Sequence, residues 1–238
     1  MQVICRSNRF VVIDDLFPEE MLHALWKTFG HEGQIPAFQK WSKVWDFGPG
    51  LAWTQVSNFY NVARAEDEAA GRRSWYSVVG GMFLKIAEHF PELIRPGWDD
   101  LRLHYHMYGQ GTRLGWHVDH HSSCSFTWYP HPEWRSSWGG EMLVAEAPAL
   151  EPGIKLVLSL DRRQEDALLT DGLGTYIAPK PNRLVLLAPG MWHSVARVDQ
   201  NAGDALRCSV VGFLVKKEVK PAPVEDKVEI QSNDHPSM

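Results

Sequence analysis

Three side chains of metal-binding type give the sharpest chemical signal in the sequence. His117 and Asp119 lie two positions apart in Trp116-His117-Val118-Asp119, and on a β-strand this spacing points both side chains to one face. His193 follows 74 residues later (119 to 193) and opens another short run. Two imidazoles and one carboxylate on one face of an ion leave three coordination positions open, a donor set that selects non-haem Fe(II). The sequence therefore predicts a ferrous site with room for a bidentate co-substrate and dioxygen.

An arginine at the start of an apolar run gives the second sign of a binding site. Arg207 comes 14 residues after His193 (193 to 207), and residues 199–204 read as a turn between two strands. If this hairpin pairs position 197 with 207, then His193, Arg207 and Ser209 share one face. A guanidinium grips a carboxylate with two parallel hydrogen bonds, so Arg207, with the Ser209 hydroxyl, is expected to bind the far carboxylate of 2-oxoglutarate. Arg197 is the alternative for the same role.

The elements that must position these residues change in type along the chain. A strand is expected at Phe10–Leu16, a helix from about Pro18 to a stop at Gly30, and a second helix at about Ser74–Phe90. Residues 31–73 read as loops with short helices. After Trp98, runs rich in β-branched and aromatic residues alternate with turn residues, as strands of a sandwich or barrel do; the runs are 101–108, 123–129, 141–146, 183–188, 193–198 and 206–215.

The domain organisation follows from this change from helical to strand patterns. We expect a mainly β protein with flanking α-helices, in which residues 1–215 form a single catalytic domain. Its helical buttress covers about 10–98 and its β core about 99–215. Residues 216–238 are polar, contain Pro221, Pro223 and Pro236, and lack periodicity, which predicts a flexible tail.

Composition excludes several classes of partner. The formal net charge of −5 and the absence of a long Lys/Arg run give no basis for binding nucleic acid or an anionic membrane. No apolar stretch reaches the length of a membrane span, and the first residues do not read as a secretory signal. The 3 cysteines are isolated, without the spacing of a zinc site or a disulfide framework, so a reducing cytoplasm is predicted. Nothing in the sequence sets the oligomeric state.

A set of motifs, in order along about 10–215, carries a family resemblance. The motifs are FVVIDDLFPEEML near the start, Tyr108-Gly109-Gln110-Gly111 with His117-Val118-Asp119, Trp138-Gly139-Gly140-Glu141-Met142-Leu143, and Asn182-Arg183-Leu184-Val185-Leu186-Leu187 followed by His193-Ser194-Val195, Gly203 and Arg207. Together they resemble the iron(II)/2-oxoglutarate oxygenases, in the prolyl-4-hydroxylase-like branch. The resemblance implies a double-stranded β-helix (jelly roll) of two four-stranded sheets around the site.

The resemblance also implies how the co-substrates are held. 2-Oxoglutarate would bind the metal at one end and Arg207 at the other, while O2 takes a remaining metal position. Tyr129 falls where the branch often places a tyrosine that helps to bind the far carboxylate, and Tyr108 is a second candidate. Many hydroxylases of the branch use lysine where this chain has Arg207, and the charge is the same.

The substrate is predicted only by class. The segment from Ser125 to Glu141 resembles oxygenases that act on free amino acids in natural-product biosynthesis, and some of those relatives are halogenases. Halogenases lack the carboxylate ligand, so Asp119 favours hydroxylation or another halide-free oxidation. The segment resemblance favours a small amino-acid-like molecule as the substrate. Residues proposed to contact this substrate are His120, His121, Trp138, Glu141 and Arg73.

Other functions stay open on the sequence alone. The first alternative within the same chemistry is a hydroxylase of peptidyl proline or of another protein side chain. A cupin-like metal enzyme would use no 2-oxoglutarate, and it would leave Arg207 without a role. An iron-free barrel could serve as a binding module, although an intact His/Asp/His set with a suitable arginine argues against loss of the metal.

Overall fold

The structure is a computed structural model of the chain. It describes residues 1–29, 35–36, 52–54, 58–119, 121–149, 168, 170 and 172–216. The predicted helix stop at Gly30, the candidate His120 and residues 217–238 of the predicted tail lie outside this description.

The N-terminal part combines three helices with short strands. They are β1 Gln2–Arg6, β2 Phe10–Asp14, α1 Glu19–Phe29, β3 Ile35–Pro36, β4 Ala52–Thr54, β5 Asn58–Phe59, α2 Tyr60–Ala70 and α3 Trp75–His89. The expected strand at Phe10 and the helices ending near Phe29 and Phe90 are confirmed. Strand β1 and the 11-residue helix α2 were not predicted as such.

The C-terminal part is built from strands joined by turns and short 3-10 segments. In order these are η2 Pro91–Leu93, β6 Asp100–Tyr108, β7 Leu114–His117, β8 Cys124–Trp128, η3 Ser136–Trp138, β9 Met142–Ala145, β10 Gly174–Ile177, β11 Leu184–Leu187, β12 His193–Val195, η4 Gln200–Ala202 and β13 Arg207–Val215. All six runs expected as strands contain one, which confirms the mainly β class. Strand β10 was missed, and the strand expected around residues 116–119 is β7, which ends at His117.

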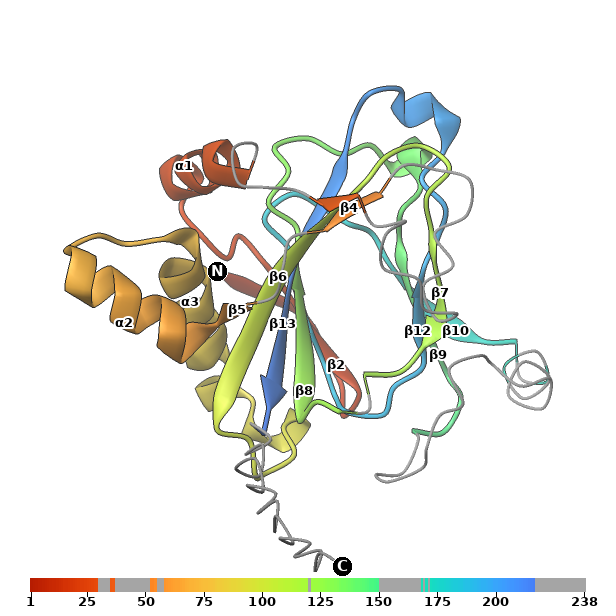
Figure 1. The fold of residues 1–238 in the computed structure, drawn as a ribbon. Coiled ribbons are helices and arrows are strands. Elements are labelled where there is room, and N and C mark those ends of the chain that lie inside the picture. The colour runs from red at the N-terminus through yellow and green to blue at the C-terminus, as the bar shows by residue number, and fades with distance from the viewer. Residues whose placement is uncertain are drawn as a thin grey trace, which may run out of the picture.

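Two antiparallel sheets face each other in the described part of the chain. The larger has nine strands, in the order β1-β2-β11-β8-β13-β6-β4-β3 with β5 beside β6, and the smaller has the order β10-β9-β12-β7. The helices lie against the outer face of the larger sheet, on the side away from β7, β9, β10 and β12 (Figure 1). One face of the larger sheet therefore meets helices and the other meets the smaller sheet.

Alternation along the strands supplies both faces with apolar side chains. On β6, Leu103, Tyr105 and Met107 belong to the core shared with the helices, where α3 contributes Val79 and Phe83. A second buried cluster lies between the two sheets and includes residues of β2, β9, β10 and β11; its members are Phe10, Val12, Tyr129, Met142, Val144, Ile177, Val185, Leu187 and Met191. This second core holds the sheets together around the site.

Two expectations about the sheets are wrong. The implied pair of four-stranded sheets is a nine-stranded and a four-stranded sheet, because β1–β5 extend the larger one. The proposed hairpin between positions 197 and 207 does not form, because β12 pairs with β7 and β9 while β13 pairs with β6 and β8. The segment between them crosses from one sheet to the other, and its Gly139↔Val198 bridge joins it to the β9 side instead.

Candidate metal and co-substrate site

The three predicted metal-binding side chains meet in the structure. His117 ends β7 and His193 begins β12, and the two residues are direct partners in the antiparallel pair. Their ring centroids are 4.1 Å apart. Asp119 follows two residues after the end of β7, so its carboxylate reaches the pair from a turn and not from the strand face that was expected. Each residue offers one donor atom, and these atoms lie within 4.8 Å of one another.

The orientation of the two imidazoles suits a metal ion. His117 Nδ1 lies 2.8 Å from the carbonyl oxygen of Gly115, and His193 Nδ1 lies 3.0 Å from that of Met191. A carbonyl only accepts a hydrogen bond, so each ring donates from Nδ1 and keeps the Nε2 lone pair for an ion. Both Nε2 atoms face Asp119, at 4.0 Å for His117 and 3.4 Å for His193.

The charges within the cluster depend on one another. Burial, together with the neighbouring His193, lowers the pKa of His117 to about 4, so that this ring is neutral. Although burial acts against it, the Asp119 carboxylate raises the pKa of His193 above its ordinary value. Burial likewise opposes ionisation of Asp119, but His193 and a hydrogen bond with Ser125 hold the pKa of this carboxyl below its usual range. An ionised carboxylate next to imidazole nitrogens is a site that a divalent cation would complete.

Arg207 occupies a buried pocket at the start of β13. Its side chain is almost fully enclosed, with 1% of the residue exposed. The guanidinium carbon lies 5.0 Å from the ring centre of Tyr129 and 5.6 Å from that of Tyr108, and Nε donates to the carbonyl oxygen of Gly140 at 2.5 Å. No carboxylate among the described residues pairs with it, so the structure buries a cation that still lacks a counter-charge.

The groups around this guanidinium can also donate hydrogen bonds. Nη1 donates to Ser209 Oγ at 3.3 Å and Nη2 to the Tyr129 hydroxyl oxygen at 3.4 Å. Each hydroxyl accepts from arginine and keeps its own proton to donate. Burial raises the pKa of Tyr129 and of Tyr108, so both phenols stay protonated. The pocket thus offers a cation and hydroxyl donors together, as a carboxylate requires.

One strand of the larger sheet connects the two groups of residues. Ser125 on β8 hydrogen-bonds Asp119, and Tyr129 directly follows β8 and contacts Arg207. Four positions of extended chain separate Ser125 from Tyr129, which is roughly 13 Å. The cation pocket and the His/Asp cluster therefore lie along one wall of the same barrel, although the hairpin expected to join them does not exist.

The candidate substrate residues are placed differently. His121 is exposed next to the cluster, and Glu141 is half-buried directly before β9. Trp138 is half-buried in η3, where its ring contacts that of Trp134 edge to face at 5.2 Å. Arg73 is exposed in the turn between α2 and α3, on the helical side of the larger sheet (Figure 1). The structure does not bring Arg73 to the cluster.

The alternative carboxylate-binding residue is placed elsewhere. Arg197 is exposed, and its Nη1 donates to the carbonyl oxygen of Gly111 at 3.3 Å. Its side chain has none of the enclosure or the hydroxyl neighbours of Arg207. The buried Arg207 therefore suits the proposed binding of a carboxylate better than the exposed Arg197.

Sequence reasoning missed two contributors to the site. Ser125 reaches Asp119, and its position on the inner face of β8, four residues before Tyr129, was the available signal. Gly140 accepts from Arg207 through its backbone, and its φ of +74° is a conformation that favours glycine. A Cβ at Gly140 would lie 2.6 Å from Arg207 Cδ, so the glycine at this position makes room for the arginine.

Comparison with known proteins agrees with this geometry. Residues 103–215 match the model of the 2OG-Fe(II) oxygenase superfamily. The matched segment contains the whole His/Asp/His cluster, Arg207, Tyr129 and Ser209. Among curated proteins, no sequence matches this chain significantly.

Solved structures show the same fold at low sequence identity. A prolyl-4-hydroxylase from Pseudomonas putida is 17% identical, with 87% of this chain and 92% of that chain covered and a TM-score of 0.54. An oxidoreductase of the 2OG-Fe(II) oxygenase family from Burkholderia pseudomallei is 13% identical (coverage 87% and 85%, TM-score 0.52). HygX from Streptomyces hygroscopicus, with nickel and 2-oxoglutarate bound, is 9% identical (coverage 87% and 82%, TM-score 0.50).

Fold, site geometry and family model define the class. Residues 103–215 match the 2OG-Fe(II) oxygenase superfamily, and the fold is a double-stranded β-helix, as in the prolyl-4-hydroxylase of Pseudomonas putida. The matched domain supports an Fe(II)/2-oxoglutarate-dependent dioxygenase, a class that uses Fe(II), 2-oxoglutarate and O2. None of the helices in the described residues has the length and apolar character that crossing a bilayer requires.

Proposed function

We propose that this enzyme hydroxylates an unactivated C–H bond of a small amino-acid-like molecule. His117, Asp119 and His193 are the proposed iron ligands, and Arg207 is the proposed partner of the far carboxylate of 2-oxoglutarate. The observation that carries the proposal is a pair of complementary sites along one barrel wall. One presents two Nε2 atoms and a carboxylate within 4.8 Å, and the other presents a buried guanidinium without a carboxylate partner among the described residues.

The bound cofactor supplies the oxidising chemistry, in which 2-oxoglutarate and O2 are converted to succinate and CO2 while one oxygen atom enters the substrate. The donor set fits this cofactor, because two neutral imidazoles and one carboxylate leave positions open on a ferrous ion. The Gly115 and Met191 carbonyls fix each ring so that Nε2 is available. His117 is already neutral, and metal binding would require His193 to give up its proton.

The Arg207 pocket orients the co-substrate. The guanidinium has five N–H bonds, of which three have partners among the described residues, so two remain for a carboxylate. The Tyr129 and Ser209 hydroxyls add donors of their own. Because the pocket is buried, each charge-assisted hydrogen bond is stronger than it would be in water, and the co-substrate is fixed before the substrate reacts.

Apolar packing keeps water away from the reacting groups. The cluster between the sheets places Val144 opposite His193 on β9 and brings Met191 and Leu187 next to the same end of the barrel. Such a wall excludes water and limits side reactions of the oxidant. On a bound iron, Asp119 would fill a position that a halide would need, which supports oxygen transfer as the outcome.

The substrate class rests on the segment between β8 and β9. The half-buried Trp138 and Glu141 and the exposed His121 are the proposed substrate contacts that the structure describes, and His120 remains a proposal. Trp138 and Glu141 flank the Gly139-Gly140 pair, and the Gly140 carbonyl accepts a hydrogen bond from Arg207. We also propose that residues 1–215 form one catalytic domain, since β1 and β2 belong to the same sheet as β6, β8 and β13.

The second candidate is a hydroxylase of peptidyl proline or another protein side chain. The prolyl-4-hydroxylase of Pseudomonas putida has the same fold, and this similarity is the reason to keep the candidate. Free amino acids and short proline-containing peptides discriminate between the two functions because they differ in size and in free amino and carboxyl groups.

Succinate release tests the proposal. The Fe(II)-loaded enzyme is incubated with 2-oxoglutarate, O2 and either a panel of free amino acids and derivatives or a panel of proline peptides, and substrate-dependent succinate is measured with product mass. A product heavier by one oxygen in the first panel is the expected result. Reaction with peptides alone would replace the proposal by the second candidate, and Asp119→Ala serves as the control for iron-dependent turnover.

A further inference from the structure

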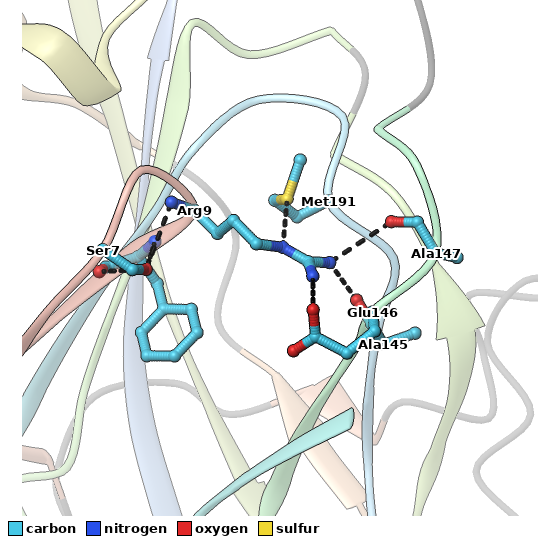
Figure 2. A network of polar contacts seen from close by, with 7 residues as sticks. Ser7, Arg9, Ala145, Glu146, Ala147 and Met191 are labelled. Atoms are coloured by element: carbon cyan, nitrogen blue, oxygen red, sulfur yellow. Dashed lines mark hydrogen bonds and ion pairs between the residues drawn. The ribbon is translucent and has the colours of Figure 1, made fainter. Parts of the chain in front are cut away.

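A single arginine joins the two sheets next to His193. Arg9 lies in the turn between β1 and β2, and its guanidinium extends to the far end of β9 (Figure 2). Nη1 donates to the Glu146 carboxylate, while Nη2 donates to the Ala145 carbonyl and, at 3.2 Å, to the Ala147 carbonyl. Nε lies 3.4 Å from the sulfur of Met191. The side chain of Arg9 is only 18% exposed.

The turn around Arg9 is itself fixed by hydrogen bonds. The Ser7 hydroxyl accepts from the backbone N–H groups of Arg9 at 3.2 Å and Phe10 at 3.1 Å, and it donates to the Phe10 carbonyl (Figure 2). On the other side, Ala188 N–H donates to the Arg9 carbonyl at 2.8 Å. Arg9 is therefore held by its backbone before its side chain reaches across to the smaller sheet.

Arg9 contacts two residues of the turn that leads into His193. That turn begins at Ala188, which is bonded to the Arg9 backbone, and contains Met191, whose sulfur meets the Arg9 side chain. The Met191 carbonyl accepts from His193 Nδ1 at 3.0 Å. The Trp192 carbonyl accepts from Ala145 N–H at 3.0 Å, so the same turn is tied to the strand end that Arg9 also holds.

We propose that Arg9 is a positioning residue of the metal site, which fixes the Met191 carbonyl and through it the Nδ1–H tautomer and direction of His193. This inference rests on the proposed role of His193 as an iron ligand. Arginine suits the task because its planar fork directs N–H bonds at several fixed acceptors at once, here two carbonyls, a carboxylate and a sulfur. A lysine ammonium keeps the charge but cannot reach this set in one geometry.

A second arginine of the same N-terminal hairpin, Arg6, makes different contacts from those of Arg9. Arg6, on β1, pairs with Glu92 at 2.7 Å, and the two side chains are 58% and 43% exposed. Its guanidinium lies 5.3 Å from the ring centre of Phe90. Neither Glu92 nor Phe90 belongs to the turn that leads into His193. Arg6 therefore provides a matched control that removes an arginine of the same hairpin without touching the turn.

The test compares Arg9→Met, Arg9→Lys and Arg6→Met in the full-length protein. The first measurement is the tautomer of His193 in the metal-free protein at alkaline pH, where the ring is neutral, from side-chain 15N chemical shifts assigned with a His193→Gln variant. The second is Fe(II) affinity by anaerobic titration. We expect a single Nδ1–H tautomer in the wild type and in Arg6→Met, and a mixture in both Arg9 variants. Fe(II) affinity should fall about tenfold in the Arg9 variants, at the lower end of what second-sphere changes cause.

The possible outcomes separate the roles. Arg9 variants that are folded, keep a single His193 tautomer and bind Fe(II) like the wild type would overturn the proposal, even if their melting temperature is lower. Restoration of both readouts by Arg9→Lys would also overturn it, since charge alone would then suffice. If Arg9→Met does not fold, Arg9→Lys carries the test. If the wild type itself binds no Fe(II), the proposed function fails, while the tautomer comparison still decides the role of Arg9.

Discussion

Replacing Arg207 by methionine should separate co-substrate binding from protein stability. Methionine keeps much of the length and apolar surface of the side chain but removes the charge. In the free protein the guanidinium is buried with hydrogen bonds to neutral groups only among the described residues. Its removal relieves the cost of burying a charge and leaves the Gly140 carbonyl without its donor. These effects oppose each other, so we expect the free energy of unfolding without ligand to change by less than about 2 kcal/mol.

The effect on 2-oxoglutarate is expected to be much larger. Truncating one member of a buried, hydrogen-bonded charge pair costs about 2–5 kcal/mol. A loss of about 2.7 kcal/mol weakens binding about 100-fold, since 1.4 kcal/mol corresponds to a factor of ten. At a concentration of about 100 times the wild-type Kd, the ligand stabilises the wild type by about 2.7 kcal/mol but the variant by only about 0.4 kcal/mol.

Urea unfolding measures both quantities in one experiment. The protein is loaded with Ni(II), which avoids turnover, and unfolded with and without 2-oxoglutarate. Arg197→Met is the matched control, because Arg197 is exposed and was the rival for the same role. The reasoning is refuted if Arg207→Met keeps the ligand-dependent gain in stability, or if Arg197→Met loses it.

Three further changes test parts of the site and the fold. Gly140→Ala should lower the free energy of unfolding by about 1 kcal/mol or more and weaken 2-oxoglutarate binding, because its Cβ would clash with Cδ of the buried Arg207 side chain. Gly203 also has a positive φ, but a Cβ there meets nothing within 4 Å, so Gly203→Ala should lower stability alone. Unfolding and ligand titrations measure both effects. Tyr129→Phe removes one hydroxyl and should raise the Kd of 2-oxoglutarate by about five- to tenfold in calorimetry, with an unchanged Kd as the contrary result. Although burial raises it, hydrogen bonds led by Arg183 lower the pKa of Asp14 below its ordinary 3.8, so this carboxylate contributes stability above about pH 4 that is lost as pH falls. Asp14→Asn should therefore flatten the decline in melting temperature below about pH 5, and an unaltered decline would show that another group is responsible.

The sequence could single out the residues proposed to carry the chemistry, because their types are specific and their order is fixed. A His-x-Asp pair, a distant histidine and an arginine between apolar residues have few joint structural explanations. The β runs were equally legible, since apolar and β-branched residues such as those of Leu184–Leu187 and Arg207–Val215 are buried within the sheets. These signals are local, so they can be read without knowing which strand pairs with which.

Strand pairing was the part that the sequence could not supply. A short turn-like segment between two strands suggested a hairpin, but residues 196–206 carry the chain from the smaller sheet to the larger one. The correct explanation for Arg207 is tertiary: Tyr108 comes from β6, Tyr129 follows β8, and Gly140 precedes β9. Convergence of that kind depends on long-range packing, which no window of neighbouring residues contains.

Short or polar elements were missed or misplaced for a related reason. Strand β7 has four residues, Leu114–His117, and its glycine and its inward-facing histidine weaken the alternation that marks a strand. Helix α2 has few apolar residues and buries only Ala63 and Asp67, so its helical face is hard to recognise. Both elements are defined by what they pack against.

Anaerobic titration of Fe(II) into the protein with 2-oxoglutarate tests the central claim most directly. A ferrous ion held by the two histidines and the aspartate, with 2-oxoglutarate chelated to it, should give a weak visible charge-transfer absorption that saturates at one ion per chain. The absorption should be lost in His193→Ala and reappear only at much higher 2-oxoglutarate in Arg207→Met. A folded wild-type protein that gives no such absorption, or a His193→Ala variant that gives it unchanged, would contradict the assignment of these residues to an iron and 2-oxoglutarate site.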